Sequence, residues 1–194
     1  IRDSSSSFQN AVLAAGELEG VFPVDTKSLC TGMALLVIKA CEMRDAGLPA
    51  KEIAEQIALL REKVHTTFIL NTLDYLSRGG RCSAVTAFGA NLLSIKPSIE
   101  MVDGALEVGK KYRGKIETVY GQYIRDQLSD PDKLDLSRAF LSHSGGGISE
   151  ETLQAMKKEI LKCAPFQEVQ IIRAGCTISA HCGPKTATVM FMEK

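Results

Sequence analysis

Residues 73–97 read LDYLSRGGRCSAVTAFGANLLSIKP and contain two short helical segments in succession. The first ends at Gly-Gly-Arg, where Gly79 suits the left-handed residue that closes a helix, and Asn71 or Thr72 can cap its start. The second, over residues 84–93, ends at Ile-Lys-Pro. Neither segment has the residue spacing of a phosphate-binding loop, a metal site or a catalytic triad. The function must therefore be inferred together with the segments that surround this stretch.

The segments around this stretch predict strands and one tight hairpin. Residues 66–70 are β-branched and aromatic, which is typical of a strand. The Asp103-Gly104 dipeptide between two apolar runs strongly indicates a two-residue hairpin turn. Later in the chain, strands are predicted over residues 140–142, 169–173 and 187–192, and the last two are joined through a loop that contains His181. Helices are predicted over residues 116–124 and from Ser149 to residue 163.

The first part of the chain predicts helices that alternate with a strand. Serines able to cap a helix precede residues 8–19. Residues 21–24 are predicted to be a short strand, in which Pro23 indicates an edge strand or a strand end. A helix whose first half is fully buried is expected over residues 33–46, and then an amphipathic helix over residues 49–64. This pattern predicts an α/β protein: residues 1–65 form part of a Rossmann-like α/β domain, and residues 66–194 form an α+β domain with a mixed or antiparallel sheet.

The composition limits the class of protein. Of the 194 residues, 45% are apolar and 24% charged, which is an ordinary balance for a soluble globular protein. Lys+Arg and Asp+Glu number 23 each, so the net charge favours neither nucleic acid nor an anionic membrane. The longest apolar run, over residues 32–38, is too short to span a bilayer. We therefore expect a soluble protein.

The chain begins at Ile1 and enters a run of serines almost at once. We therefore expect an N-terminal segment to precede it in a longer protein. The six cysteines include no Cys-x-x-Cys pair, and several lie within apolar helical or strand patterns. Reduced thiols in a cytoplasmic protein are the simplest interpretation.

Hydrolytic and metal chemistry find little support in the sequence. The serines at residues 4–7 together with His181 or His143 could supply a nucleophile and a base, but a Gly-x-Ser-x-Gly elbow is absent. Serines in front of a helix are most often caps. Cys176, His181 and Cys182 match no standard zinc spacing, so we expect no metal.

Two features remain open from the residues alone. The Gly145-Gly146-Gly147 run before a helix can cradle an anion with its backbone amides, or it can be a flexible loop. His181 lies in a turn bounded by Gly183 and Pro184. It is either a hydrogen-bonded structural residue or a side chain directed into a cleft.

Several short phrases occur in an order that resembles the DegV family, and together they span almost the whole chain. They are Phe8-Gln9-Asn10-Ala11, Val24-Asp25-Thr26-Lys27-Ser28, Thr72-Leu73-Asp74-Tyr75-Leu76, Gly79-Gly80-Arg81, Ile95-Lys96-Pro97, Lys111 with Arg113-Gly114, and His181-Cys182-Gly183-Pro184. One such match would be weak, but several at family-like spacing make a strong case. The resemblance implies a DegV-like fold and a bacterial fatty-acid-binding protein.

What the resemblance implies about the site is specific. A long-chain fatty acid would lie in an apolar tunnel between two domains, with its carboxylate held by His181 and Ser5. Ser4 and Ser6 replace the leucine and glycine of the family's Leu-Ser-Gly loop, so Ser6 or Ser7 is an alternative to Ser5. The chain lacks a threonine that the family supplies from an earlier segment. Lys185 replaces the last glycine of the usual His-x-Gly-Pro-Gly turn.

The sequence alone does not decide which residues line the tunnel. The apolar residues after Gly80 are candidates, and plain core is an equal alternative. These candidates are Val85, Phe88, Leu92, Leu93 and the segment that begins at Ile95.

The resemblance also implies a partner, the ATP-dependent catalytic subunit of a fatty acid kinase. The chain itself would be non-catalytic, with no cofactor other than its acyl ligand. The kinase would make an acyl phosphate for membrane lipid synthesis, so membrane contact would be transient. Arg81 and Arg113 would lie near the pocket mouth. The basic run KKYRGK at residues 110–115 is either an interaction surface or a solvated turn, and a phosphotransferase that uses His181 is the alternative function.

Overall fold

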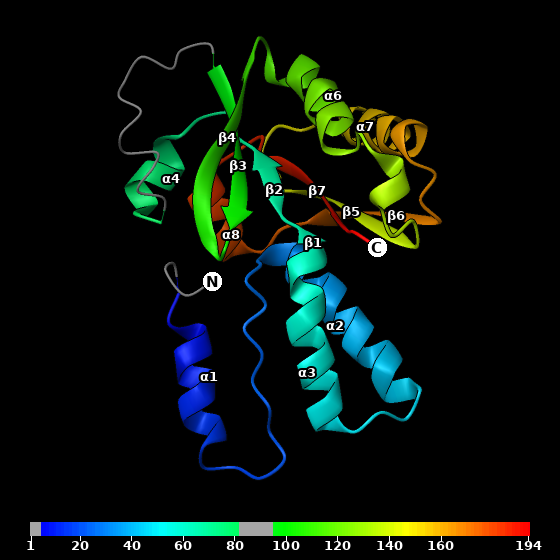
Figure 1. Cartoon of the computed structure of the whole chain (residues 1–194). Helices are drawn as coiled ribbons and strands as arrows, with labels where there is room; N and C mark the ends of the chain where they lie inside the picture. The colour runs from blue at the N-terminus through cyan, green and yellow to red at the C-terminus, as the bar shows by residue number, and fades with distance from the viewer. Residues whose placement is uncertain (1–4, 82–94) are drawn as a thin grey trace.

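The computed structural model describes residues 5–81 and 95–194, and its centre is a mixed β-sheet (Figure 1). Along the sheet the strand order is β4-β3-β2-β7-β5-β6, and β1 pairs with β7 beside this path. β5 and β6 are parallel, whereas the other pairs are antiparallel. The predicted α/β class with a mixed sheet is therefore confirmed. The strands are β1 Val64–His65, β2 Thr67–Ile69, β3 Ile95–Val102, β4 Ala105–Arg113, β5 Arg138–His143, β6 Glu168–Arg173 and β7 Ala187–Met192.

Helices cover both faces of this sheet. The α-helices in the described ranges are α1 Ser7–Ala15, α2 Cys30–Asp45, α3 Ala50–Leu60, α4 Asp74–Gly79, α6 Ile116–Gln127, α7 Glu150–Cys163 and α8 Cys176–Cys182. Two short 3-10 helices, η1 Arg61–Lys63 and η2 Pro131–Lys133, accompany them. None of the helices in the described part of the chain is long and apolar enough to cross a bilayer.

Successive side chains of a strand point to opposite faces of the sheet, so each face has its own core. On one face, Val189 and Phe191 of β7 pack with α6 and α7 in the largest apolar cluster. On the other face, Met190 and Met192 pack against α2 and α3. The predicted full burial of the first half of α2 was wrong, because Met33 and Val37 are exposed. Phe68 of β2 belongs to a separate cluster with α4 and α8. The second face is therefore covered by two groups of helices rather than by one continuous layer.

The predicted hairpin is present between β3 and β4. Val102 pairs with Ala105, and the two turn residues, Asp103 and Gly104, have φ values of 49° and 84°. Left-handed conformations at both positions give the turn a twist that matches the flanking strands. β4 continues to Arg113, so residues 110–113 of KKYRGK lie in a strand, whereas the sequence left an interaction surface and a solvated turn open for this run.

The N-terminal segment differs from its prediction in two respects. The helix predicted over residues 8–19 is α1, which ends at Ala15 and has no buried residue. Residues 21–24 form irregular chain rather than a strand. A strand needs a neighbour for its backbone hydrogen bonds, and no described strand pairs with this segment.

Two predictions about the later segments were wrong. The loop predicted between the last two strands contains the helix α8, and β6 and β7 are not neighbours because β5 lies between them. The left-handed residue that ends α4 is Gly80, with φ of 64°, whereas Gly79 is the last helical residue. Residues 84–93 lie outside the described residues, and the domain boundary after residue 65 stays a prediction.

Candidate functional site

A cavity of about 810 Å³ lies beside the second face of the sheet and is bounded by segments far apart in sequence. The N-terminal end of α1 points toward the part of the molecule that holds α4 and α8 (Figure 1). The apolar lining residues are Phe8, Ala11, Pro23, Val24, Leu29, Met33, Phe68, Leu76, Leu106 and Ile178. The others are Ser5, Ser6, Ser7, Asp25, Thr26, Ser28, Cys30, Arg81, Thr177, His181 and Cys182.

His181 lies in the last turn of α8, and the backbone that follows it is held by side-chain hydrogen bonds. Gly183 adopts φ of 76°, and Ser144 Oγ donates to its carbonyl oxygen at 2.6 Å. Thr186 Oγ1 donates to the carbonyl oxygen of Cys182 at 2.8 Å. Both hydrogen bonds fix the backbone at the end of α8, and this backbone carries the His181 side chain.

The imidazole of His181 lies against Gly79 of α4. A Cβ atom on Gly79 would collide with Nδ1 of the ring, so only glycine allows the two helices to approach this closely. Gly183 has the same relation to the ring of Tyr75. Among the described residues, none forms a hydrogen bond with the His181 side chain. Packing against Gly79 therefore positions the ring beside the cavity.

Ser5 reaches the same cavity from the start of α1, together with Ser6 and Ser7. Its Oγ lies 2.7 Å from Oγ of Ser7 and accepts a hydrogen bond from the Ser7 N–H at 3.2 Å. Ser5 thus satisfies the backbone N–H of Ser7, the first residue of α1, whereas the N-cap residue Ser6 makes no side-chain cap hydrogen bond to the helix. The structure therefore brings Ser5 and His181, which are 176 positions apart in sequence, to one cavity.

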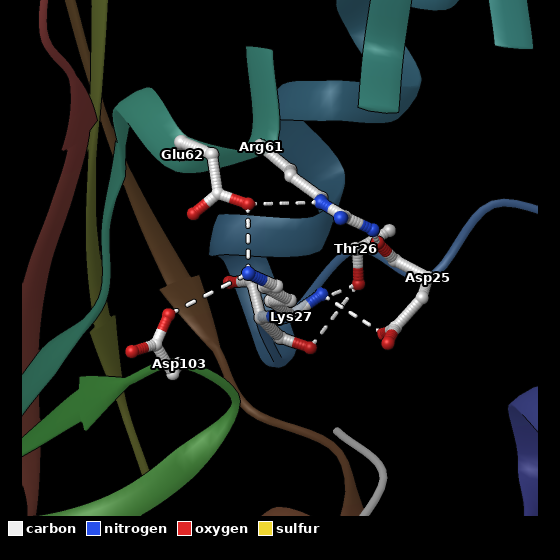
Figure 2. A network of polar contacts seen from close by, with 7 residues as sticks. Asp25, Thr26, Lys27, Arg61, Glu62 and Asp103 are labelled. Atoms are coloured by element: carbon white, nitrogen blue, oxygen red, sulfur yellow. Dashed lines mark hydrogen bonds and ion pairs between the residues drawn. The ribbon is translucent and has the colours of Figure 1, made fainter. Parts of the chain in front are cut away.

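Polar contacts hold the segment over residues 25–28 against the rest of the molecule, and Figure 2 shows this network around Lys27. Nζ of Lys27 lies 2.8 Å from Glu62 Oε1 and 3.6 Å from Asp103 Oδ1. Lys27 itself has φ of 46°, which is unusual for a residue with a side chain. The hydrogen bond from Lys27 lowers the pKa of the Glu62 carboxyl. One ammonium group therefore connects η1, the tip of the β3–β4 hairpin and the cavity wall.

Hydrogen bonds also fix Asp25 and Ser28, which lie on either side of Lys27 in the sequence. Arg61 Nη1 donates to the carbonyl oxygen of Asp25 at 2.8 Å, and Asp25 Oδ1 accepts from the Lys27 N–H at 3.1 Å (Figure 2). The hydroxyl of Ser28 lies 2.6 Å from that of Thr66, at the start of the central sheet. Asp25 and Ser28 are buried and line the cavity, so this network determines the shape of one wall.

A family model described as "Uncharacterised protein, DegV family" matches residues 2–194. The chain belongs to the DegV family. It is 29% identical, over 98% of its length, to a DegV domain-containing protein of Clostridium acetobutylicum, and 30% identical, over 97%, to one of Clostridium perfringens. It spans 66% of the length of each of these curated relatives.

Solved structures of DegV proteins share the fold. A Thermus thermophilus DegV family protein, described by its fatty acid binding, is 27% identical with a TM-score of 0.83, over 100% of this chain and 68% of that one. The Streptococcus pneumoniae Fatty Acid Kinase (Fak) B3 protein loaded with linoleic acid has a TM-score of 0.83 at 23% identity, over 98% and 68% of the two chains. The latter likeness shows the fold alone.

The two arginines predicted at the pocket mouth of this DegV chain lie in different places. Arg81 lines the cavity, and its Nη1 donates to the carbonyl oxygen of Gly79 at 2.7 Å. Arg113 is exposed at the end of β4, pairs in register with Ile95, and is not among the cavity-lining residues. In the KKYRGK run, Nζ of Lys110 forms an ion pair with Asp126 at 2.8 Å.

Sequence reasoning missed several residues of the DegV cavity. Asp25 and Ser28 were predicted only as a polar turn, although their phrase was one of those that resemble the family. Cys30 and Cys182 also line the cavity, and no local pattern indicates this. The tunnel candidates Val85, Phe88, Leu92 and Leu93 lie outside the described residues, and Ile95 is absent from the described cavity lining. No group of three or more potential metal ligands occurs within residues 5–81 and 95–194.

Proposed function

We propose that this chain binds a long-chain fatty acid in the cavity, with the carboxylate held by His181 and Ser5. The observation that carries the proposal is that one cavity joins a largely apolar wall to an imidazole without a partner among the described residues and to a row of serine hydroxyls. The DegV fold supports the same assignment, because a relative with 27% identity is described by its fatty acid binding.

The physical chemistry of the cavity suits an acyl tail. Burial of roughly 15 methylene groups at about 0.8 kcal/mol each gives on the order of 10 kcal/mol before the costs of ordering and association. Phe68, Leu76 and Ile178 provide apolar wall on the side of α4 and α8. Leu29 and Met33 of the α2 region extend that wall. A tail that enters this space needs no charged partner along its length.

The head group needs only a few hydrogen bonds once the tail is buried. Hydrogen bonds to an ionised carboxylate are shorter and stronger than neutral ones. His181 and Ser5 can donate such bonds, and Ser6 or Ser7 is the alternative hydroxyl because both also line the cavity. Arg81 lies in the same lining and supplies a positive charge near the mouth.

The proposal includes a non-catalytic role beside a separate enzyme. A cytoplasmic ATP-dependent fatty acid kinase would phosphorylate the presented carboxylate, and this chain would need no cofactor and no nucleic acid. Membrane contact would be transient, during ligand exchange. Arg113 is exposed on β4 and can serve as a contact for the kinase. This part of the proposal rests on the resemblance of the sequence phrases to the DegV family, and the Streptococcus pneumoniae Fatty Acid Kinase (Fak) B3 protein adds only a shared fold.

Native mass spectrometry of the full-length protein tests acyl binding directly. A co-purifying or added fatty acid should appear as a mass increment of one acyl chain per protein. A protein that carries no acyl ligand after incubation with palmitic and oleic acids would contradict the proposal. Transfer of labelled phosphate to the protein, abolished by His181→Ala, would instead favour a phosphotransferase.

A further inference from the structure

A groove of about 690 Å³ lies between α7 and β6, and none of its lining residues lines the acyl cavity. β6 is the last strand in the sheet order (Figure 1), and among the described strands it pairs only with β5. Five consecutive residues of β6, from Val169 to Arg173, line the groove. The outer backbone N–H and C=O groups of an edge strand have no partner in the sheet. The groove therefore offers the free edge of β6 to another chain.

α7 forms the other side of this groove. Its lining residues Glu150, Leu153, Gln154 and Lys157 are spaced so that they share one face of the helix. Leu153 and Val169 are buried and provide an apolar floor between helix and strand. Because α7 connects the parallel strands β5 and β6, it runs back along them. A groove between a helix and a free strand edge is a geometry in which an extended peptide can add to a sheet.

The charges in the groove favour an acidic chain. Among the described residues, none forms a hydrogen bond or an ion pair with the side chain of Arg173 or Lys157. The carboxylate in the lining, Glu150, accepts a hydrogen bond from Gln154 Nε2 at 2.8 Å. Two cations without partners and one hydrogen-bonded carboxylate give the lining a net positive charge. Carboxylates of a bound chain would complement this charge.

The run Gly145-Gly146-Gly147 lies at the Arg173 end of the groove. Its φ values are 75°, 55° and 95°. A Cβ atom on Gly145 would lie 3.1 Å from Arg173 Nε, so the guanidinium packs on this loop. The Gly145 N–H donates to His143 Nδ1, whereas no described residue accepts a hydrogen bond from the N–H of Gly146 or Gly147. The guanidinium and these two N–H groups can therefore hold a carboxylate together.

We infer that the groove binds the extended C-terminal segment of a partner protein, which adds to β6 as a further, parallel strand. Its terminal carboxylate lies against Arg173 and the glycine loop, and an acidic side chain meets Lys157. Lys157 lies two turns along α7 from Glu150, which corresponds to about 10 Å of helix rise. A strand covers that length in about three residues, so we expect the acidic residue about three positions before the C-terminus.

The test screens the full-length protein against an array of hexapeptides with varied sequences, each with glutamate three positions before the C-terminus. Each sequence is present as the free acid and as the C-terminal amide, and fluorescence polarisation gives the affinities of the best binders. We expect the free acid to bind roughly tenfold more tightly, because the amide cannot accept the charge-assisted hydrogen bonds. Methylation of alternate backbone nitrogens should abolish binding, since the peptide then cannot pair with β6.

Two variants locate the contacts. Arg173→Gln should remove the preference for the free acid, and Lys157→Gln should remove the preference for glutamate over glutamine at its position. Lys158→Gln is the matched control, because Lys158 is an exposed lysine of the same helix that is not among the groove-lining residues. This variant should keep both preferences.

The absence of any binding peptide, or equal binding of acids and amides to the unmodified protein, would overturn the inference. Equal effects of Lys157→Gln and Lys158→Gln would indicate general charge attraction and would overturn it as well. If Arg173→Gln does not fold, the comparison of acid with amide on the unmodified protein still decides. Oleic acid binding, followed in parallel by native mass spectrometry, tests the proposed function separately, because the two sites have no lining residue in common.

Discussion

Gly79 and His181 are in such close contact that a methyl group on the glycine would overlap Nδ1 of the imidazole. The two residues belong to α4 and α8, which also meet where Tyr75 lies on Gly183. The small size of two glycines therefore sets the distance between these helices. The same contact holds the imidazole beside the cavity.

Gly79→Ala should weaken fatty acid binding by about 1–2 kcal/mol, because overpacking displaces the ring from its place beside the cavity. Isothermal titration calorimetry with oleic acid measures the change. Gly175→Ala is the matched control, since a Cβ there meets nothing within 4 Å. Equal affinities of the two variants would show that the close contact does not position the imidazole.

His181→Ala should weaken acyl binding by roughly 1–3 kcal/mol, as expected for loss of a charge-assisted hydrogen bond. His143→Ala serves as the control, because His143 accepts a hydrogen bond from the Gly145 N–H at 3.1 Å and does not line the main cavity. Displacement of a fluorescent fatty acid gives both affinities. An unchanged affinity in His181→Ala would remove this residue from the head-group site.

Lys185 has φ of 60° at the position where the family's turn usually carries glycine. The turn thus keeps a glycine-like backbone with a lysine in place. Lys185→Gly should be more stable than Lys185→Ala by about 1 kcal/mol, because only alanine retains the left-handed strain. Both variants lose the 2.8 Å ion pair with Glu117, so that term cancels. Urea unfolding measures the difference, and equal stabilities would show that the turn relaxes.

Glu62→Gln should lower stability at neutral pH but not in acid. The hydrogen bond from Lys27 lowers the pKa of Glu62 below its ordinary value of 4.5. The stabilisation is therefore fully present above that ordinary value and is lost as pH falls through the lower folded-state pKa. Thermal unfolding of both proteins between neutral and acid pH follows this change. Glu55→Gln, an exposed position on α3, is the control, and a difference that persists in acid would contradict the assignment.

Features that depend on neighbours in sequence were predictable without the fold. The Asp103-Gly104 turn forms because both residues tolerate a left-handed backbone, and Ser149 caps α7 by accepting a hydrogen bond from the Thr152 N–H. Short-range sterics and local hydrogen bonds decide such features, so a few adjacent residues carry the whole signal.

Other features depend on contacts between distant segments, and only the tertiary structure decided them. The insertion of β5 between β6 and β7, the irregular chain at residues 21–24 and the packing role of Gly79 all follow from which surfaces meet. The presence of Cys30 and Cys182 in one cavity has the same origin. The hydrophobic effect is non-directional and stabilises any arrangement that buries enough apolar surface. No local sequence pattern therefore specifies which side chains will line the same cavity.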